Sequence, residues 1–65
     1  MHISLRLLWV FNMVILAVEE LETRRITEGK DYTRDELIEI CLQYGKSGTL
    51  LRNEADLALD CIESM

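Results

Sequence analysis

The run Leu7–Val18, LLWVFNMVILAV, constrains the fold of this chain more than any other segment. Its twelve residues carry no charge and include one polar side chain, Asn12. At about 100° per residue, a helix spreads these side chains over every direction. A chain of 65 residues makes one small domain, which buries only about 60% of its unfolded surface. We therefore expect part of the run to be covered by a second copy, a partner protein or lipid.

The composition favours an all-α fold. Proline is absent and glycine occurs three times, which is typical of uninterrupted helices. We predict a first, long apolar helix over residues 4–26, since the residues after the run are helix-forming and Glu20 stands four positions before Arg24. A strand over residues 2–7 is the alternative, because apolar and polar residues alternate there. That alternation ends at Leu8, so helix is favoured.

The start of a second helix has the strongest local signal in the chain. Thr33 and Glu36 form the pattern of a capping box, in which each side chain bonds the backbone amide of the other residue. Tyr32 and Leu37 stand where a hydrophobic staple is expected. These residues predict a helix over residues 34–44.

A third helix is predicted over residues 49–64. Gly45 ends the helix before it, and Ser47 or Thr49 is available as its N-cap. Apolar residues that recur at steps of four and three form a core stripe: Leu51, Ala55, Ala58, Ile62 and Met65. Three more apolar residues widen this stripe on one side: Leu50, Leu57 and Cys61. Residues 1–65 are thus expected to form a single all-α domain of three helices. The long apolar helix packs on a short helical hairpin, and homodimerisation completes the core.

The predicted dimer or partner interface lies on the first helix, at Leu8, Trp9, Asn12, Met13 and Leu16. At a seam between helices, one Asn can bond its mate and fix the register of the pair. The alternative is that Asn12 bonds locally or faces water. Trp9 is the sole tryptophan, and aromatic residues are enriched at binding hot spots. A tryptophan in an apolar helix is nevertheless more often a core residue.

Charge indicates the kind of partner. The net charge is −5, and all twelve acidic residues follow Val18. Nucleic-acid phosphates require Lys and Arg, so direct nucleic-acid binding is not expected. A protein with a basic surface is compatible with this charge. The predicted acidic surface is formed by the second and third helices, at Asp35, Glu36, Glu39, Asp56 and Asp60.

No pattern in the chain predicts catalysis or a cofactor. The segment 45–47, GKS, resembles the end of a phosphate-binding loop, but Ile40 occupies the place of its first glycine. Cys41 and Cys61 are expected as reduced thiols on inward faces, with a disulfide as the alternative. A zinc site needs four ligands as a rule, and His2 is the one histidine. We expect no enzyme, no metal and no cofactor.

The favoured function is a non-catalytic protein–protein interaction module in the cytoplasm, acting as a small acidic regulator or inhibitor. Small acidic proteins of this kind are often encoded by phages and other mobile elements, an association rather than a physical argument. The alternative is a membrane-anchored protein with the apolar helix in the bilayer. A span needs about 20 apolar residues, and the run provides twelve. A cleaved leader is a third, less favoured interpretation of the same run.

Overall fold

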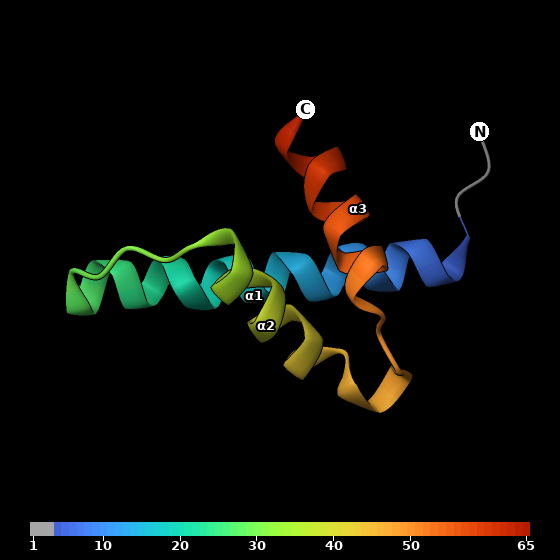
Figure 1. Cartoon of the computed structure of the whole chain (residues 1–65), viewed down its shortest axis with the longest axis horizontal. Coiled ribbons are helices and arrows are strands. Elements are labelled where there is room, and N and C mark those ends of the chain that lie inside the picture. Colours follow the sequence, from blue (N-terminus) through green and yellow to red (C-terminus); the bar gives the residue numbers. More distant parts are fainter. Residues whose placement is uncertain (1–3) are drawn as a thin grey trace.

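The computed structural model describes residues 4–65, except for the side chain at position 47, and its regular structure is helical throughout this range (Figure 1). Its elements are α1 (Leu5–Glu28), α2 (Arg34–Tyr44), the 3-10 turn η1 (Lys46–Gly48) and α3 (Arg52–Glu63). The predicted all-α class with three α-helices is confirmed for the described residues. The strand alternative for residues 2–7 lies partly outside them, and from Leu5 onward the chain is α1.

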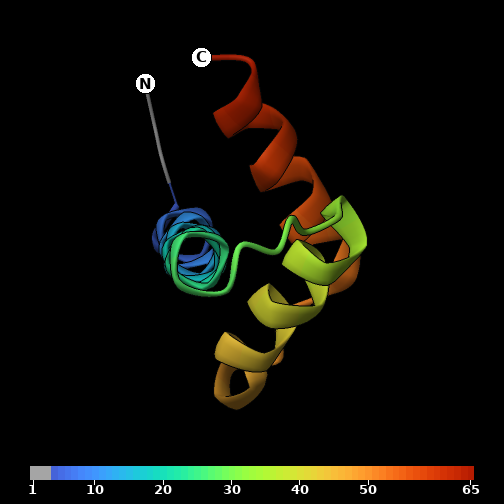
Figure 2. The same cartoon turned by 90° about the vertical axis from the view of Figure 1, so that its left-hand side faces the viewer.

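The helix α1 is the longest element, and both other helices pack on the same side of it. Figure 2 looks along α1 and shows α2 and α3 together on that side. The face of α1 toward them buries Val10, Val14, Ala17 and Leu21, which recur at steps of four and three. In the described part of the chain, no element covers the opposite face of α1.

The ends of α1 are set by local capping. The Ser4 hydroxyl accepts a hydrogen bond from the Leu7 amide at 3.1 Å, which satisfies one of the free amides of the first turn. Gly29 ends the helix in the left-handed conformation (φ 66°), and its N–H donates to the Arg25 carbonyl. The helix continues to Glu28, two residues beyond the predicted end.

The helix α2 has the predicted bounds, residues 34–44, and the predicted capping box. The Glu36 amide donates to the Thr33 hydroxyl and the Thr33 amide donates to the Glu36 carboxylate, both at 3.2 Å. Tyr44 follows Leu37 and Cys41 at the helical spacing of the apolar residues, a pattern that predicts an inward position, but it lies at the surface. Its hydroxyl donates to the Glu20 carboxylate at 2.7 Å, because the phenol reaches the polar flank of α1.

The helix α3 begins later than the prediction over residues 49–64. The first residues of the predicted helix belong instead to the connector between α2 and α3. In this connector η1 forms first, and Thr49 then adopts a left-handed conformation (φ 57°). The N-cap is therefore Leu51, not Ser47 or Thr49. The Leu51 amide donates to the Glu54 carboxylate at 3.1 Å. The acid at the third helical position thus makes the half of a capping box that requires no hydroxyl at the N-cap.

The face of α3 that is buried also differs from the predicted face by a rotation about the helix axis. The apolar residues that face the core are Ala55, Ala58, Leu59 and the half-buried Ile62. Leu57 and Cys61 were expected to widen this stripe but are exposed, because Leu59 widens it on the opposite side. Leu51 and Met65 are exposed as well, since one precedes α3 and the other follows it.

One hydrophobic core joins all three helices. It contains the fully buried Cys41 and residues of α1, α2 and α3, together with Leu50 from the segment before α3: Val10, Val14, Ala17, Leu21, Leu37, Ile38, Leu50, Ala55, Ala58 and Leu59. No buried side-chain nitrogen or oxygen among the described residues lacks a hydrogen-bond partner. The polar residues therefore lie at the surface, where the candidate sites are.

Candidate interaction surfaces

The face of α1 that points away from α2 and α3 is apolar at its centre. Leu8, Ile15 and Leu16 have exposed fractions of 52%, 47% and 41%, and the exposed Asn12 lies between them. Together with the exposed Leu5, these residues form what we name the outer stripe of α1. Leu5, Leu8, Asn12 and Ile15 follow steps of three, four and three, the spacing of a helix-pairing seam.

The structure divides the predicted interface between two faces of α1. Leu8, Asn12 and Leu16 lie on the outer stripe. Trp9 and Met13 are half-buried and pack against the core, so they are not part of that surface. Sequence reasoning missed Ile15, because a run that is apolar in every direction does not reveal which face turns inward.

Trp9 is held between η1 and the guanidinium of Arg6. The Arg6 guanidinium carbon lies 5.2 Å from the centre of the indole ring, a cation–π distance. On the η1 side, Gly48 approaches the ring so closely that a Cβ at this position would lie 2.5 Å from the ring carbon Cζ2. The absence of a side chain at Gly48 therefore allows η1 to pack on Trp9.

Arg6 also joins α1 to the start of α3. Its Nε and Nη2 atoms donate to the two Glu54 carboxylate oxygens at 2.9 and 2.7 Å, a bidentate pair. The same guanidinium donates to the carbonyl oxygens of Gly48 and Thr49. Two hydrogen bonds hold the pKa of Glu54 below its usual value. The larger effect comes from Arg6 and the smaller one from the Leu51 amide. Sequence reasoning missed this pair, which is separated by 48 residues.

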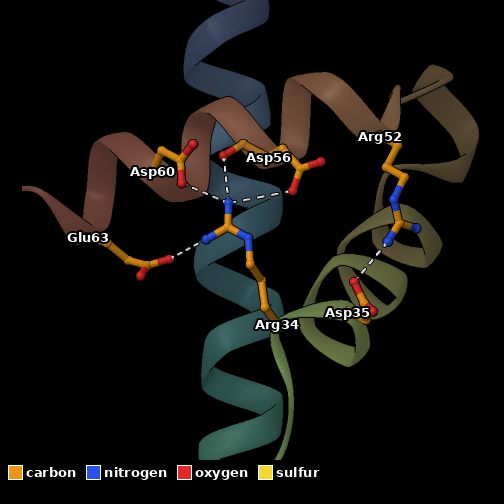
Figure 3. Close-up of polar contacts among 6 residues, drawn as sticks. All are labelled: Arg34, Asp35, Arg52, Asp56, Asp60 and Glu63. Atoms are coloured by element: carbon orange, nitrogen blue, oxygen red, sulfur yellow. Dashed lines mark hydrogen bonds and ion pairs between the residues drawn. The ribbon is translucent and has the colours of Figure 1, made fainter.

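On α2 and α3, the predicted acidic surface is organised by two arginines (Figure 3). Arg34, at the start of α2, reaches across to α3. Its Nη2 donates to the Asp60 carboxylate at 2.8 Å and lies 3.5 Å from that of Asp56. Its Nη1 donates to Glu63 at 2.8 Å. Arg34 thus sits among three carboxylates of α3, of which Glu63 was not predicted.

Arg52 makes the reciprocal connection from α3 to α2. It pairs with Asp35 at 3.2 Å and with Glu39 at 3.1 Å. We name this set the acidic face, in which Asp56 is half-buried and the other four residues are exposed: Asp35, Glu39, Asp56, Asp60 and Glu63. Glu36, the remaining predicted member, is used in the capping box of α2.

The acidic face keeps an excess of negative charge despite these pairs. Its five carboxylates share two arginines. Residues 33–65 carry seven acidic and three basic side chains, a net −4 of the total −5. The side chains of Asp35, Glu39 and Asp60 are 87%, 64% and 65% exposed, so they remain accessible to a partner.

The described residues contain little that resembles a chemical site. No group of three or more His, Cys, Asp or Glu side chains within residues 4–65 is arranged to hold a metal. Both cysteines are free thiols, and burial raises the pKa of Cys41 to about 11. An open hollow of about 420 Å³ between the helices is lined mostly by apolar groups, including Val18 and Leu59.

Among the described helices, none combines the length and the apolar composition needed to cross a membrane. The chain was compared with protein-family models, with curated proteins and with solved structures. No family model, curated protein or solved structure matches it.

Proposed function

We propose that this chain is a non-catalytic protein-binding module that recognises a basic surface on a partner protein. The observation that supports this proposal is the acidic face, where five carboxylates from two helices share two arginines on one exposed surface. A local excess of one charge sign attracts a complementary partner and accelerates its association. By occupying that basic surface, the module acts as a regulator or inhibitor.

The arginines of the acidic face are compatible with such a partner. Exposed ion pairs contribute only about 0–1 kcal/mol each. A carboxylate has several acceptor positions, so one that is bound to Arg52 or Arg34 can accept a second cation. Because these pairs are weak and exposed, the carboxylates remain available to the cations of a partner.

Two double variants of equal charge test the acidic face. Asp35→Asn/Glu39→Gln neutralises two positions on it, and Glu28→Gln/Asp31→Asn neutralises two exposed positions at the end of α1 and in the loop after it. Partners captured from a lysate are identified by mass spectrometry and then measured singly. We expect the first variant to bind a given partner more weakly and to associate more slowly, while the second binds like the parent.

Salt dependence supplies the second criterion. Exposed charges are screened within about 3 Å at 1 M salt and about 10 Å at 0.1 M. Binding through the acidic face should therefore weaken steeply as salt rises. Equal affinity at about 50 mM and about 1 M salt would contradict an electrostatic contact, as would equal binding by the two double variants.

We further propose that the module is a homodimer through the outer stripe of α1. Leu8, Ile15 and Leu16 form a contiguous apolar surface around Asn12, and exposed apolar surface of this kind favours association. Sedimentation of the parent over a concentration series tests this. Leu8→Asp should yield a monomer with unchanged helicity, because this side chain is exposed within one copy.

A further inference from the structure

We infer that the two α1 helices of the proposed homodimer pair in antiparallel orientation, with the twofold axis at Asn12. This inference rests on the homodimer proposed above and adds the alignment of its helices. Two antiparallel helices related by this axis bring residues together in pairs whose numbers sum to 24. The argument uses the spacing of the outer stripe, the chemistry of the Asn12 amide and the charges at its two ends.

The two leucines nearest Asn12 on the outer stripe are placed symmetrically about it. Leu8 stands four residues before Asn12 and Leu16 four residues after it, and both are exposed leucines. In an antiparallel pair centred on Asn12, Leu8 of each copy therefore lies opposite Leu16 of the other. Two leucine layers then enclose the central amides, and the same surface on each copy is complementary to itself, as a twofold interface requires.

The Asn12 side chain determines the alignment of the pair. Its amide has an NH₂ group that donates hydrogen bonds and an oxygen that accepts them. An apolar partner that covered the amide would leave these hydrogen bonds unmade, at a cost of about 1–3 kcal/mol of binding free energy. At the twofold axis, the NH₂ group of each Asn12 can donate to the amide oxygen of the other. An alignment shifted by one turn would place Asn12 against apolar side chains and lose both bonds.

Charge favours the antiparallel orientation over the parallel one. Glu19 continues the spacing of the outer stripe and is exposed. A parallel pair would place the two Glu19 carboxylates at the same level, where they repel. In the antiparallel pair Glu19 lies opposite Leu5, at the N-terminal end of the other α1. The first turn of α1 contains no acidic residue of its own, so its positive helix dipole can interact with this carboxylate.

The length of the contact sets the expected strength. From Leu5 to Glu19 the stripe extends about 21 Å at 1.5 Å per residue. A contact of about four helical turns lies at or below the lower end of stable interfaces, about 1,200 Å² in total. We therefore expect a reversible dimer with a dissociation constant in the micromolar range, and the test should use a concentration series reaching about 100 µM.

Disulfide trapping tests the alignment in the full chain. Cys61 is exposed and is first replaced by Ser, while the buried Cys41 is kept. Leu8→Cys and Leu16→Cys are prepared separately, with tags of different size, and mixed in a glutathione redox buffer. We expect the 8–16 cross-link to dominate over the 8–8 and 16–16 species. In the antiparallel pair, the two copies of position 8 are offset by about 12 Å along the axis, beyond the reach of a disulfide.

The other outcomes identify which statement fails. Dominant 8–8 and 16–16 cross-links would mean a parallel dimer, which overturns the antiparallel inference and retains the homodimer. A monomer at every concentration with no cross-link beyond that of the Cys61→Ser parent would overturn both. A monomer that instead sediments with lipid vesicles would assign the outer stripe to a bilayer surface.

A charged substitution at Ile26 provides an independent control. Ile26 is exposed and lies on the extension of the outer stripe, seven residues beyond Glu19. A parallel dimer would place the two copies of Ile26 together, whereas the antiparallel pair leaves each one uncovered. Ile26→Asp should therefore leave the dimer intact, while Leu8→Asp dissociates it. Dissociation by both variants would contradict the antiparallel alignment.

Discussion

Gly48→Ala is expected to destabilise the fold because of one close approach. The added Cβ would lie 2.5 Å from Cζ2 and 2.6 Å from Cη2 of the Trp9 ring. Carbon atoms pack at about 3.5–4.0 Å, so the ring or the turn must move by about 1 Å. The Arg6 guanidinium lies over the same ring, and its displacement would disturb the Arg6–Glu54 pair as well.

The magnitude follows from two opposing effects. Replacing Gly by Ala where the backbone is unstrained stabilises a protein by about 0.4–1 kcal/mol, and Gly48 does not have a positive φ. Overpacking typically costs about 1–3 kcal/mol. We expect a net loss of about 1–2 kcal/mol. In a domain of this size that loss lowers Tm by roughly 7–15 °C.

The assay is urea unfolding followed by the fluorescence of Trp9, the sole tryptophan, together with circular dichroism. Gly48→Ala should lower the unfolding midpoint with little change in slope. In a Trp9→Leu background, where the ring is absent, the same change should be neutral or stabilising. Unchanged or increased stability of Gly48→Ala with Trp9 present would refute the close approach as the reason for glycine.

Three further predictions concern single groups. Thr33→Ala should lower the free energy of unfolding by about 1 kcal/mol, and its combination with Glu36→Ala should be less than additive in thermal melts, because both residues act through one capping box. Since the pKa of Glu54 is depressed in the fold, its contribution is present above the usual 4.5 and is lost as pH falls through the lower folded value. Tm measured from neutral to acidic pH should therefore fall less in Glu54→Gln than in the parent. With a thiol reagent at mildly alkaline pH, the exposed Cys61 should react at once and the buried Cys41 only on unfolding; Cys61→Ser should remove the fast phase.

The parts of the fold that depend on neighbouring residues were predictable from the sequence. The bounds of α2 follow from Thr33 just before it, Glu36 in its first turn and Gly45 after it, all of which act on the adjacent backbone. Gly29 ends α1 in the conformation that glycine adopts most readily, although the helix was predicted to end at residue 26. The all-helical class follows from the lack of proline and the apolar spacing.

The parts that depend on contacts between distant segments were not predictable. The start of α3 is delayed by η1 and by Thr49 in a left-handed conformation, for which the sequence carries no signal. The Arg6–Glu54 pair joins residues 48 positions apart. The acidic face was predicted by composition, but its two arginines were not, because pairs such as Arg34–Asp60 depend on how α2 and α3 cross.

The position of α1 ahead of the two helices that cover it matters during synthesis. Val18 completes the apolar run 44 residues before Ile62, the last residue of α3 that packs on the core. At about 5–20 residues per second, the ribosome needs roughly 2–9 s to supply that stretch. For this interval the inner face of α1 has no intramolecular cover, because the helices that pack on it are not yet complete. Docking of α2 and α3 on α1 is therefore a late event in synthesis, and the inner face of α1 is completed as a core only when Ile62 has been added.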